Sequence, residues 1–286
     1  MLAFPMVDRI DTPSWVRWAA AAFVPRRDRR RFVAMLEDDL SHGYDVFGAH
    51  PDGAAIAHIL TRFLYERWFR VQSVGHAHIP CEGPVIVAAN HSGTLPFDAM
   101  MIYADLLRWT DPPRLPRVVT DSFVAGLPFI GLLFARGGAV GGSRGNVEFL
   151  LETNELVVVF PEGVPGISKP YSKRYQLQSW RTGHAELAIR FGATVVPCAL
   201  IGAEEQMPQV ARLPLRLFGA PFLPVPATPL PLPVRYSLLY GEPIRFNIDP
   251  SRSDDPAVIA EASSQVEAAV RELIKAGLSA RKGVFR

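Results

Sequence analysis

His91 and Asp98 carry side chains suited to acid–base chemistry and lie seven residues apart. They belong to the segment Asn-His-Ser-Gly-Thr-Leu-Pro-Phe-Asp at positions 90–98, which directly follows an apolar run of strand length. A histidine can take a proton from an alcohol near neutral pH when a carboxylate fixes its tautomer and stabilises the imidazolium that forms. By spacing alone a second interpretation stays open, in which the two side chains are a hydrogen-bonded structural pair.

Glu162 and Gly163 end a second segment of this kind, Phe-Pro-Glu-Gly at positions 160–163, which also follows an apolar run. A carboxylate at this place could accept hydrogen bonds from substrate hydroxyls, or it could cap the next turn of the chain. Lys169 follows, with two further cations and two tyrosines in the next six residues. These cations favour contact with phosphate groups or a membrane surface, and the alternative is a solvated loop.

Arg144 ends a glycine-rich stretch that begins at position 137. Small residues let the backbone approach a ligand, and the planar guanidinium fits an oxyanion or a phosphate. The stretch does not match the fingerprints of P-loop or dinucleotide-binding proteins, so nucleotide binding of those kinds is not predicted. A fourth cluster, Val-Val-Pro at 195–197, says little on its own.

The elements that must position these clusters alternate between two types. Continuous apolar runs of strand length lie at 85–89, 117–119, 156–160 and 194–201, and helical patterns near 97–109, 122–133, 144–152 and 181–191 separate them. Such runs suit strands that are covered on both faces. The order predicts an α/β domain with a largely parallel central sheet flanked by helices. In open sheets of this class, ligands bind at the carboxyl ends of the strands.

The N-terminal 50 residues predict a separate, helical, membrane-associating segment, and residues 51–286 predict a single α/β domain. A helix is expected at 14–24, followed by five arginines between positions 26 and 31 and by a second helix at about 31–40. An apolar helix beside a basic cluster is typical of binding to an anionic bilayer. The alternative is that the helix at 14–24 packs on the domain while the arginines are solvated.

Further along, residues 54–69 are expected to be helical, and seven prolines between 213 and 233 exclude a regular helix but allow an apolar surface lip. The last strand is expected at 235–240 and a C-terminal amphipathic helix at 256–276.

Composition excludes several classes of function. The chain has 30 Lys and Arg against 28 Asp and Glu, so its charge gives no reason to expect a nucleic-acid partner. The longest uncharged apolar run, at 123–135, has 13 residues, whereas a helix that spans a bilayer needs about 20. The first residues do not resemble a cleaved signal, which favours the cytoplasmic side. The two cysteines lack metal-binding spacing, so no metal site is predicted.

In this order, the four clusters resemble the glycerolipid acyltransferase family, which contains the lysophosphatidic acid acyltransferases. That family carries an Asn-His-x4-Asp block, a Gly-rich block ending in Arg, a Phe-Pro-Glu-Gly block and a Val-Pro block. The resemblance covers about residues 85–205. The run from 160 to 175 and the Gly-Ala-Glu-Glu segment at 202–205 are similar to a branch related to diacylglycerol-acyltransferase-like proteins.

The resemblance implies an acyltransferase that moves a fatty acyl group to a hydroxyl of a glycerolipid or lysophospholipid. The co-substrate would be acyl-CoA or acyl carrier protein, with no bound cofactor or metal. His91 would be the general base and Asp98 its orienting partner. The acceptor would be bound by Arg144, Glu162, Gly163 and Lys169. The enzyme would be a peripheral (monotopic) membrane protein on the cytoplasmic face. No oligomeric state is predicted.

This chain departs from the family pattern at Asp98, which lies seven residues after His91 instead of five, with Pro96 where the family has its aspartate. We expect a loop with two extra residues that still brings Asp98 to His91, and the alternative is a histidine oriented by another group. Val164 and Pro165 replace the hydroxyl and basic residues that often follow the glycine of the third block. This replacement argues against a simple glycerol phosphate acceptor.

Two rival functions stay open at the level of sequence. A lipid esterase or thioesterase could use the same His91 and Asp98 pair to activate water. A lipid-binding protein without catalytic activity could retain the same clusters.

Overall fold

The structure is a computed structural model and describes residues 18, 22–36, 43–92, 95–125, 127, 129–215 and 222–286. The predicted helix at 14–24 lies largely outside these residues, as does the end of the second predicted helix, at 37–40. The described part of that hairpin is α2 (Arg26–Leu36), which packs against α3 (Pro51–Phe63).

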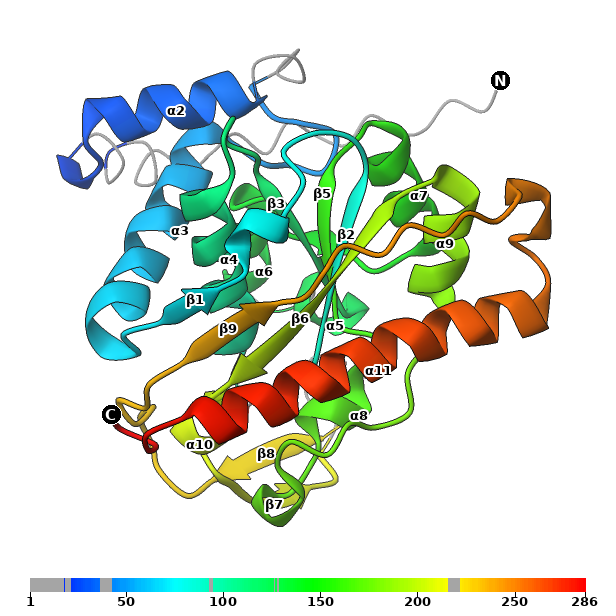
Figure 1. The fold of residues 1–286 in the computed structure, drawn as a ribbon. Coiled ribbons are helices and arrows are strands. Elements are labelled where there is room, and N and C mark those ends of the chain that lie inside the picture. The colour runs from blue at the N-terminus through cyan, green and yellow to red at the C-terminus, as the bar shows by residue number, and fades with distance from the viewer. Residues whose placement is uncertain are drawn as a thin grey trace.

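A seven-stranded sheet runs through the centre of the molecule (Figure 1). Its strands lie in the order β1-β9-β6-β2-β5-β3-β4, and all neighbours are parallel except β9 and β6. The predicted fold class, a largely parallel sheet flanked by helices, is therefore confirmed. The strands are β1 (Gln72–Val74), β2 (Val85–Ala89), β3 (Pro116–Thr120), β4 (Val140–Gly141), β5 (Leu156–Val159), β6 (Thr194–Ile201) and β9 (Ser237–Tyr240).

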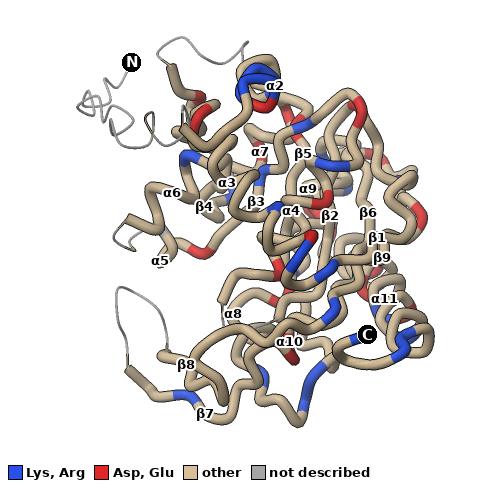
Figure 2. The backbone as a smooth tube through the Cα atoms, turned by 90° about the vertical axis from the view of Figure 1, so that its left-hand side faces the viewer, with Lys and Arg blue, Asp and Glu red and all other residues tan. Residues whose placement is uncertain are grey.

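The middle strand, β2, is buried along its whole length because it is apolar on both faces. Val85, Val87 and Ala89 point into one hydrophobic core, and Ile86 and Ala88 point into another. Side chains of α3 and α4 complete the first core, and side chains of α7, α9 and α11 complete the second. In Figure 2 the sheet lies between α3 on the left and α11 on the right. The two faces of β2 thus explain the helical layers on both sides.

The longer helices besides α2 and α3 are α4 (Phe97–Trp109), α6 (Ile130–Arg136), α7 (Arg144–Glu152), α9 (Gly183–Phe191) and α11 (Pro256–Ala280). The short turns of helix are η2 (Leu64–Trp68), η3 (His76–His78), α5 (Ser122–Ala125), α8 (Val164–Ile167), η4 (Tyr171–Lys173), α10 (Ala203–Gln206) and η5 (Pro250–Arg252).

The prediction of a single helix at 122–133 is wrong, because α5 and α6 are separate elements. Phe129, which precedes α6, has a φ of 61°, a value that a right-handed helix does not allow. The proline-rich stretch contains no regular helix in its described part, but it does contain a strand, β8 (Leu223–Pro226). That strand pairs antiparallel with β7 (Gln209–Leu213) outside the main sheet, where strand prolines are tolerated.

Candidate active site

His91 and Asp98 are brought together at the carboxyl end of β2. His91 is the second residue after the strand, and Asp98 lies in the first turn of α4, which begins after Pro96. The Nδ1 atom of His91 lies 2.6 Å from Oδ2 of Asp98. The two extra residues in the intervening segment therefore do not prevent the contact.

Asp98 is completely buried and accepts two further hydrogen bonds from the backbone of the described residues. The N–H of Ser92 donates to Oδ2 at 3.0 Å, and the N–H of Ala99 donates to Oδ1 at 2.7 Å. These donors and the N-terminal end of α4 favour a charged carboxylate. A carboxylate only accepts hydrogen bonds, so Nδ1 of His91 must carry the proton. The Nε2 atom is then the basic nitrogen of the ring.

The imidazole ring of His91 is held on one face as well as at its Nδ1 edge. It stacks on the ring of Phe160, with centroids 4.3 Å apart and an angle of 24° between the planes. Phe160 directly follows β5, the strand next to β2. Asn90, just before the histidine, bridges to the other neighbouring strand, β6, through hydrogen bonds of 3.1 and 2.8 Å to the backbone of Leu200. Contacts with both neighbouring strands, β5 and β6, therefore hold the segment that carries the histidine.

The side chain of Glu162 is buried and lies against the backbone of His91. Its Oε1 accepts the backbone N–H of His91 at 2.9 Å. Its Oε2 accepts the backbone N–H of Gln178 at 2.7 Å and lies 3.3 Å from Nζ of Lys169. Lys169 is also buried and lies 2.9 Å from Oε1 of Glu204. Glu162 and Lys169, two of the four predicted acceptor-binding residues, therefore contact each other, and Glu162 also contacts the backbone of His91.

Comparison with known proteins identifies the family. The family model described as "Acyltransferase" matches residues 70–201. An uncharacterized protein of Mycobacterium tuberculosis is 35% identical over 257 residues, which cover 85% of this chain and 72% of the relative. An uncharacterized protein of Mycobacterium leprae is 33% identical over 288 residues, covering 94% and 78%. The chain belongs to the acyltransferase family.

Two other similar proteins have informative names. A protein of Bos taurus named "DGAT1/2-independent enzyme synthesizing storage lipids" is 26% identical to this acyltransferase over 213 residues, covering 72% of this chain and 60% of the relative. The crystal structure of the 1-acyl-sn-glycerophosphate (LPA) acyltransferase from Thermotoga maritima superposes with a TM-score of 0.56 at 16% identity, covering 94% of this chain and 89% of that one. This second likeness shows a shared fold.

Two glycines in the loop after β5 of this acyltransferase have little room for a side chain, and one of them lies against His91. Gly163 has a φ of 54°, and a Cβ atom there would lie 3.1 Å from Cζ of Arg181. A Cβ atom on Gly166, in α8, would lie 2.9 Å from the Cβ atoms of both His91 and Glu162. Position 166 therefore requires glycine for the close approach of α8 to the histidine.

Arg144 begins α7 at the same carboxyl edge of the sheet, behind the N-cap Ser143. Its guanidinium is half-exposed and is paired with two carboxylates, Glu148 at 2.9 Å and Glu186. Among the described residues, none of its recorded contacts reaches His91 or Glu162. The structure therefore places Arg144 apart from the cluster around the histidine.

Sequence reasoning assigned no role to Gly166, Gln178 or Glu204. The one signal for the glycine is its place three residues after Phe-Pro-Glu-Gly. Gln178 contributes a backbone N–H, which leaves no signal in the sequence. In the described part of the chain, no group of three His, Cys, Asp or Glu side chains is placed to hold a metal ion.

Proposed function

We propose that this acyltransferase moves a fatty acyl group from acyl-CoA or acyl carrier protein to a hydroxyl of a glycerolipid or lysophospholipid, with His91 as general base. The observation that carries the proposal is the 2.6 Å contact between Nδ1 of His91 and buried Asp98. That contact leaves Nε2 of the same ring as the acceptor for a proton.

In the proposed reaction, Nε2 takes the proton of the acceptor hydroxyl while its oxygen attacks the thioester carbonyl carbon. The tetrahedral intermediate then expels the thiolate, and the imidazolium returns the proton to the leaving sulfur. Asp98 stabilises the imidazolium between these two steps. The C–S bond is replaced by a C–O bond, and the proton ends on the thiol.

Direct transfer without an acyl-enzyme is favoured by the surroundings of Ser92. This residue is the nearest candidate nucleophile in the chain, but it is buried and its backbone N–H is held by Asp98. A nucleophile that forms a covalent intermediate must reach the acyl carbon and lie within hydrogen-bonding reach of its base. A bulky thioester donor could not reach the Ser92 hydroxyl in this arrangement.

A glycerolipid acceptor is supported by the names of the two similar proteins, one a storage-lipid-synthesizing enzyme and the other an LPA acyltransferase. We propose Arg144 as the residue that meets an anionic head group, since an exposed guanidinium can exchange carboxylate partners for a phosphate. Glu162, Gly163 and Lys169 then support acceptor binding indirectly, by shaping the loop around His91.

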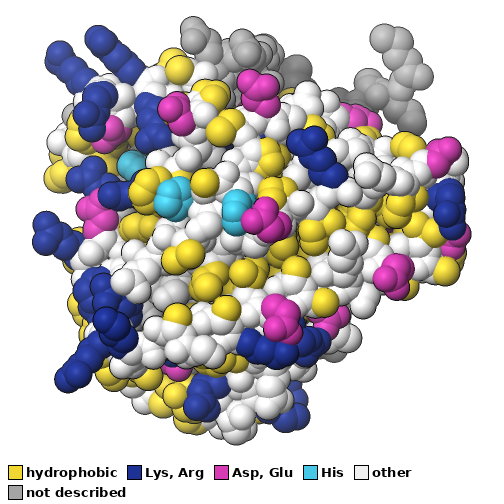
Figure 3. Space-filling model, in the orientation of Figure 1, with side chains coloured by type: hydrophobic (Ala, Val, Ile, Leu, Met, Phe, Trp, Pro, Cys, Tyr) yellow, Lys and Arg dark blue, Asp and Glu magenta, His cyan; other side chains and the backbone are white. Residues whose placement is uncertain are grey.

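A peripheral position on the cytoplasmic face of a membrane is part of the proposal. No helix in the described part of the chain combines the length and apolar character needed to cross a bilayer. Helix α2 presents the exposed side chains of Arg26, Arg27 and Arg30, and Phe23 just before it is also exposed. Figure 3 shows basic side chains projecting at the upper left, over this helix. Cations beside exposed aromatic residues suit an anionic lipid surface.

The proposal is tested by incubating the purified full chain with acyl-CoA or with acyl carrier protein that carries a fatty acyl thioester, with and without lysophospholipid, monoacylglycerol and diacylglycerol. The expected product is the acylated acceptor, with little free fatty acid when the acceptor is omitted. Fatty acid release at the same rate without acceptor would assign a hydrolase instead. Vesicle binding without turnover of any donor would assign a lipid-binding protein.

A further inference from the structure

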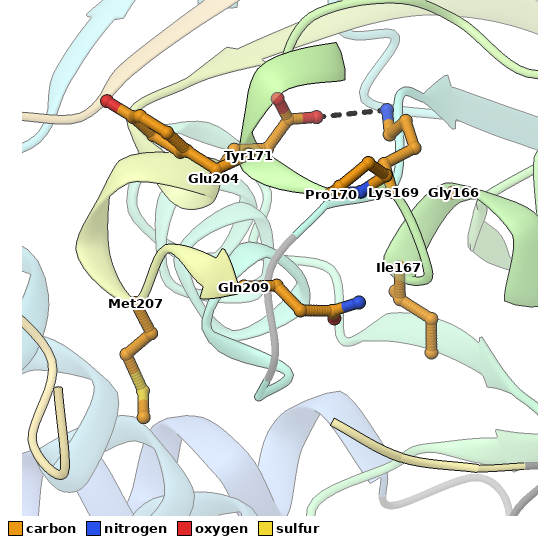
Figure 4. A pocket seen from close by; sticks show the side chains of 8 residues that line it. All are labelled: Gly166, Ile167, Lys169, Pro170, Tyr171, Glu204, Met207 and Gln209. Carbon is orange, nitrogen blue, oxygen red and sulfur yellow. Dashed lines mark ion pairs between the residues drawn. The ribbon is translucent and has the colours of Figure 1, made fainter. Parts of the chain in front are cut away.

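Three buried charges lie in one cluster behind the histidine: Glu162, Lys169 and Glu204. They come from separate elements, since Glu162 follows β5, Lys169 follows α8 and Glu204 lies in α10, after β6. The ammonium group of Lys169 lies between the two carboxylates, 3.3 Å from Glu162 and 2.9 Å from Glu204. Figure 4 shows the Lys169 and Glu204 side chains pointing toward each other at the wall of a pocket.

These charges depend on one another because each has been removed from water. A buried ion is stable only when it is paired and its remaining hydrogen-bonding groups are satisfied. Glu204 is paired with Lys169 through Oε1 and accepts the backbone N–H of Tyr175 through Oε2. Burial raises the pKa of Glu204, and the charge of Lys169 counteracts this rise. Among the described residues, neutralising Glu204 would therefore leave Lys169 with Glu162 as its single charged partner.

The cluster is connected to the catalytic histidine through Glu162. The same carboxylate that meets Lys169 with Oε2 accepts the backbone N–H of His91 with Oε1. Any shift of Lys169 toward or away from Glu162 is therefore transmitted to the backbone that carries the imidazole. The ring has little freedom to compensate, since it is held between Asp98 and Phe160.

We propose that Glu204 is a positioning residue for acyl transfer, which acts through Lys169 and Glu162 on the backbone N–H of His91. The proposal rests on His91 being the general base. Glu204 holds the ammonium group at a fixed place between the two carboxylates. Glu162 in turn holds the histidine backbone at the end of β2, with Nε2 aimed at the acceptor. The motif residues around His91 thus depend on a carboxylate 113 positions further along the chain.

The neighbouring residue, Glu205, is a matched control for this proposal. It lies in the same short helix, is similarly buried, and forms an ion pair with Arg281 near the C-terminus. Its recorded contacts do not include Lys169 or Glu162 among the described residues. Removing its charge disturbs a buried ion pair of the same type without touching the chain of contacts to His91.

The test compares kcat and KM of Glu204→Gln and Glu205→Gln in the full-length protein, with thermal unfolding as the measure of stability. In Glu204→Gln the new side chain retains an oxygen for the N–H of Tyr175 but loses the charge that faces Lys169. We expect kcat to fall roughly tenfold to a hundredfold in Glu204→Gln, because small misplacements of a catalytic group have effects of this order. We expect KM for the acyl donor to stay near its wild-type value, and Glu205→Gln to keep kcat.

A double-mutant cycle tests the route of the effect. If Glu204 acts through Lys169, the double variant Glu204→Gln, Lys169→Met should have the same kcat as Lys169→Met alone. Multiplying reductions would contradict the proposal. So would a wild-type kcat in Glu204→Gln, or an equal loss in Glu204→Gln and Glu205→Gln, which would indicate general destabilisation only.

A spectroscopic measurement separates this proposal from the function on which it rests. The backbone amide resonance of His91 should shift in Glu204→Gln and stay in place in Glu205→Gln, whether or not an active donor has been found. An unchanged resonance in both variants would overturn the positioning role. A shifted resonance in a protein whose wild type shows no acyl transfer would retain the structural link and reject the proposed reaction.

Discussion

Asp98 has two effects on His91 at the scale of single residues, since it fixes the tautomer and stabilises the charge that forms. Asp98→Asn retains the size of the side chain, but its amide can place a donor against Nδ1 and move the proton to Nε2. In a serine protease, the equivalent change lowers kcat by about 10⁴. We expect a fall of roughly 10² to 10⁴ in kcat here, measured by product formation in folded protein. A variant as active as wild type would show that another group orients the ring.

The close approach of α8 to the histidine gives a second prediction for a single residue. Gly166→Ala places a methyl group 2.9 Å from the Cβ atoms of His91 and Glu162, so the loop must move. We expect a loss of kcat of roughly a hundredfold, as for small displacements at other active sites. The matched control is Gly183→Ala, where nothing lies within 4 Å of the added atom. The steric explanation fails if both substitutions have the same effect on kcat.

How much of the site the sequence predicts depends on the distance between partners along the chain. The His91 and Asp98 pair could be predicted because both residues lie in one segment and their order matches a family pattern. The surroundings of Glu162 could not, because His91 lies 71 residues before it and Gln178, 16 residues after it, contributes only a backbone N–H. Lys169 is only 7 residues away, but no family pattern pairs it with Glu162. A carboxylate at the end of a strand looks the same in sequence whether it faces a ligand or a buried lysine.

At the scale of elements, prediction succeeded for strands that are buried on both faces and for helices whose apolar pattern extends over more than two turns. The predicted bounds of β2, β6, α4 and α7 agree with the structure. Short edge strands were missed, because β4 has only two residues and carries no pattern. The strand β8 was missed because its prolines argue against regular structure, although they fit a hairpin outside the main sheet.

Helix α9 contains a buried histidine that makes stability depend on pH. Burial lowers the pKa of His184 to about 4, from 6.5 in the unfolded chain. The folded state therefore binds this proton less readily than the unfolded state, so the stabilisation is complete above pH 6.5 and is lost as the pH falls toward 4. We expect the free energy of unfolding to fall by roughly 2 kcal/mol between pH 7.5 and pH 5 from this group.

The measurement is urea unfolding of wild type and His184→Gln at both pH values. The glutamine has no titratable group in this range, so the variant should lose roughly 2 kcal/mol less than wild type on acidification. The same pH dependence in both proteins would assign the effect to other groups.

At the scale of the whole molecule, the exposed arginines of α2 predict binding to anionic bilayers. Each basic residue near such a surface contributes about 1 kcal/mol. Replacing Arg26, Arg27 and Arg30 by serine should therefore weaken binding to phosphatidylglycerol vesicles by about a hundredfold, with less effect at high salt. Sedimentation with vesicles measures the change.

The control for this experiment replaces three exposed basic residues on the other side of the sheet. They are Arg252 in η5 and Arg271 and Lys275 in α11. These substitutions remove the same charge from the molecule but leave α2 intact. An equal loss of binding in the two triple variants would show that net charge matters and that the α2 surface does not.

The fold as a whole brings the carboxyl ends of the parallel strands β2, β5 and β6 to one edge of the sheet. The proposed role of His91 as general base depends on this arrangement. The direct test is the rate of acyl transfer by His91→Ala, with folding checked by circular dichroism. Removing the base should lower kcat by a factor of roughly 10² to 10⁴. The thermal unfolding transition should be retained. Wild-type transfer by a folded His91→Ala protein would contradict the account.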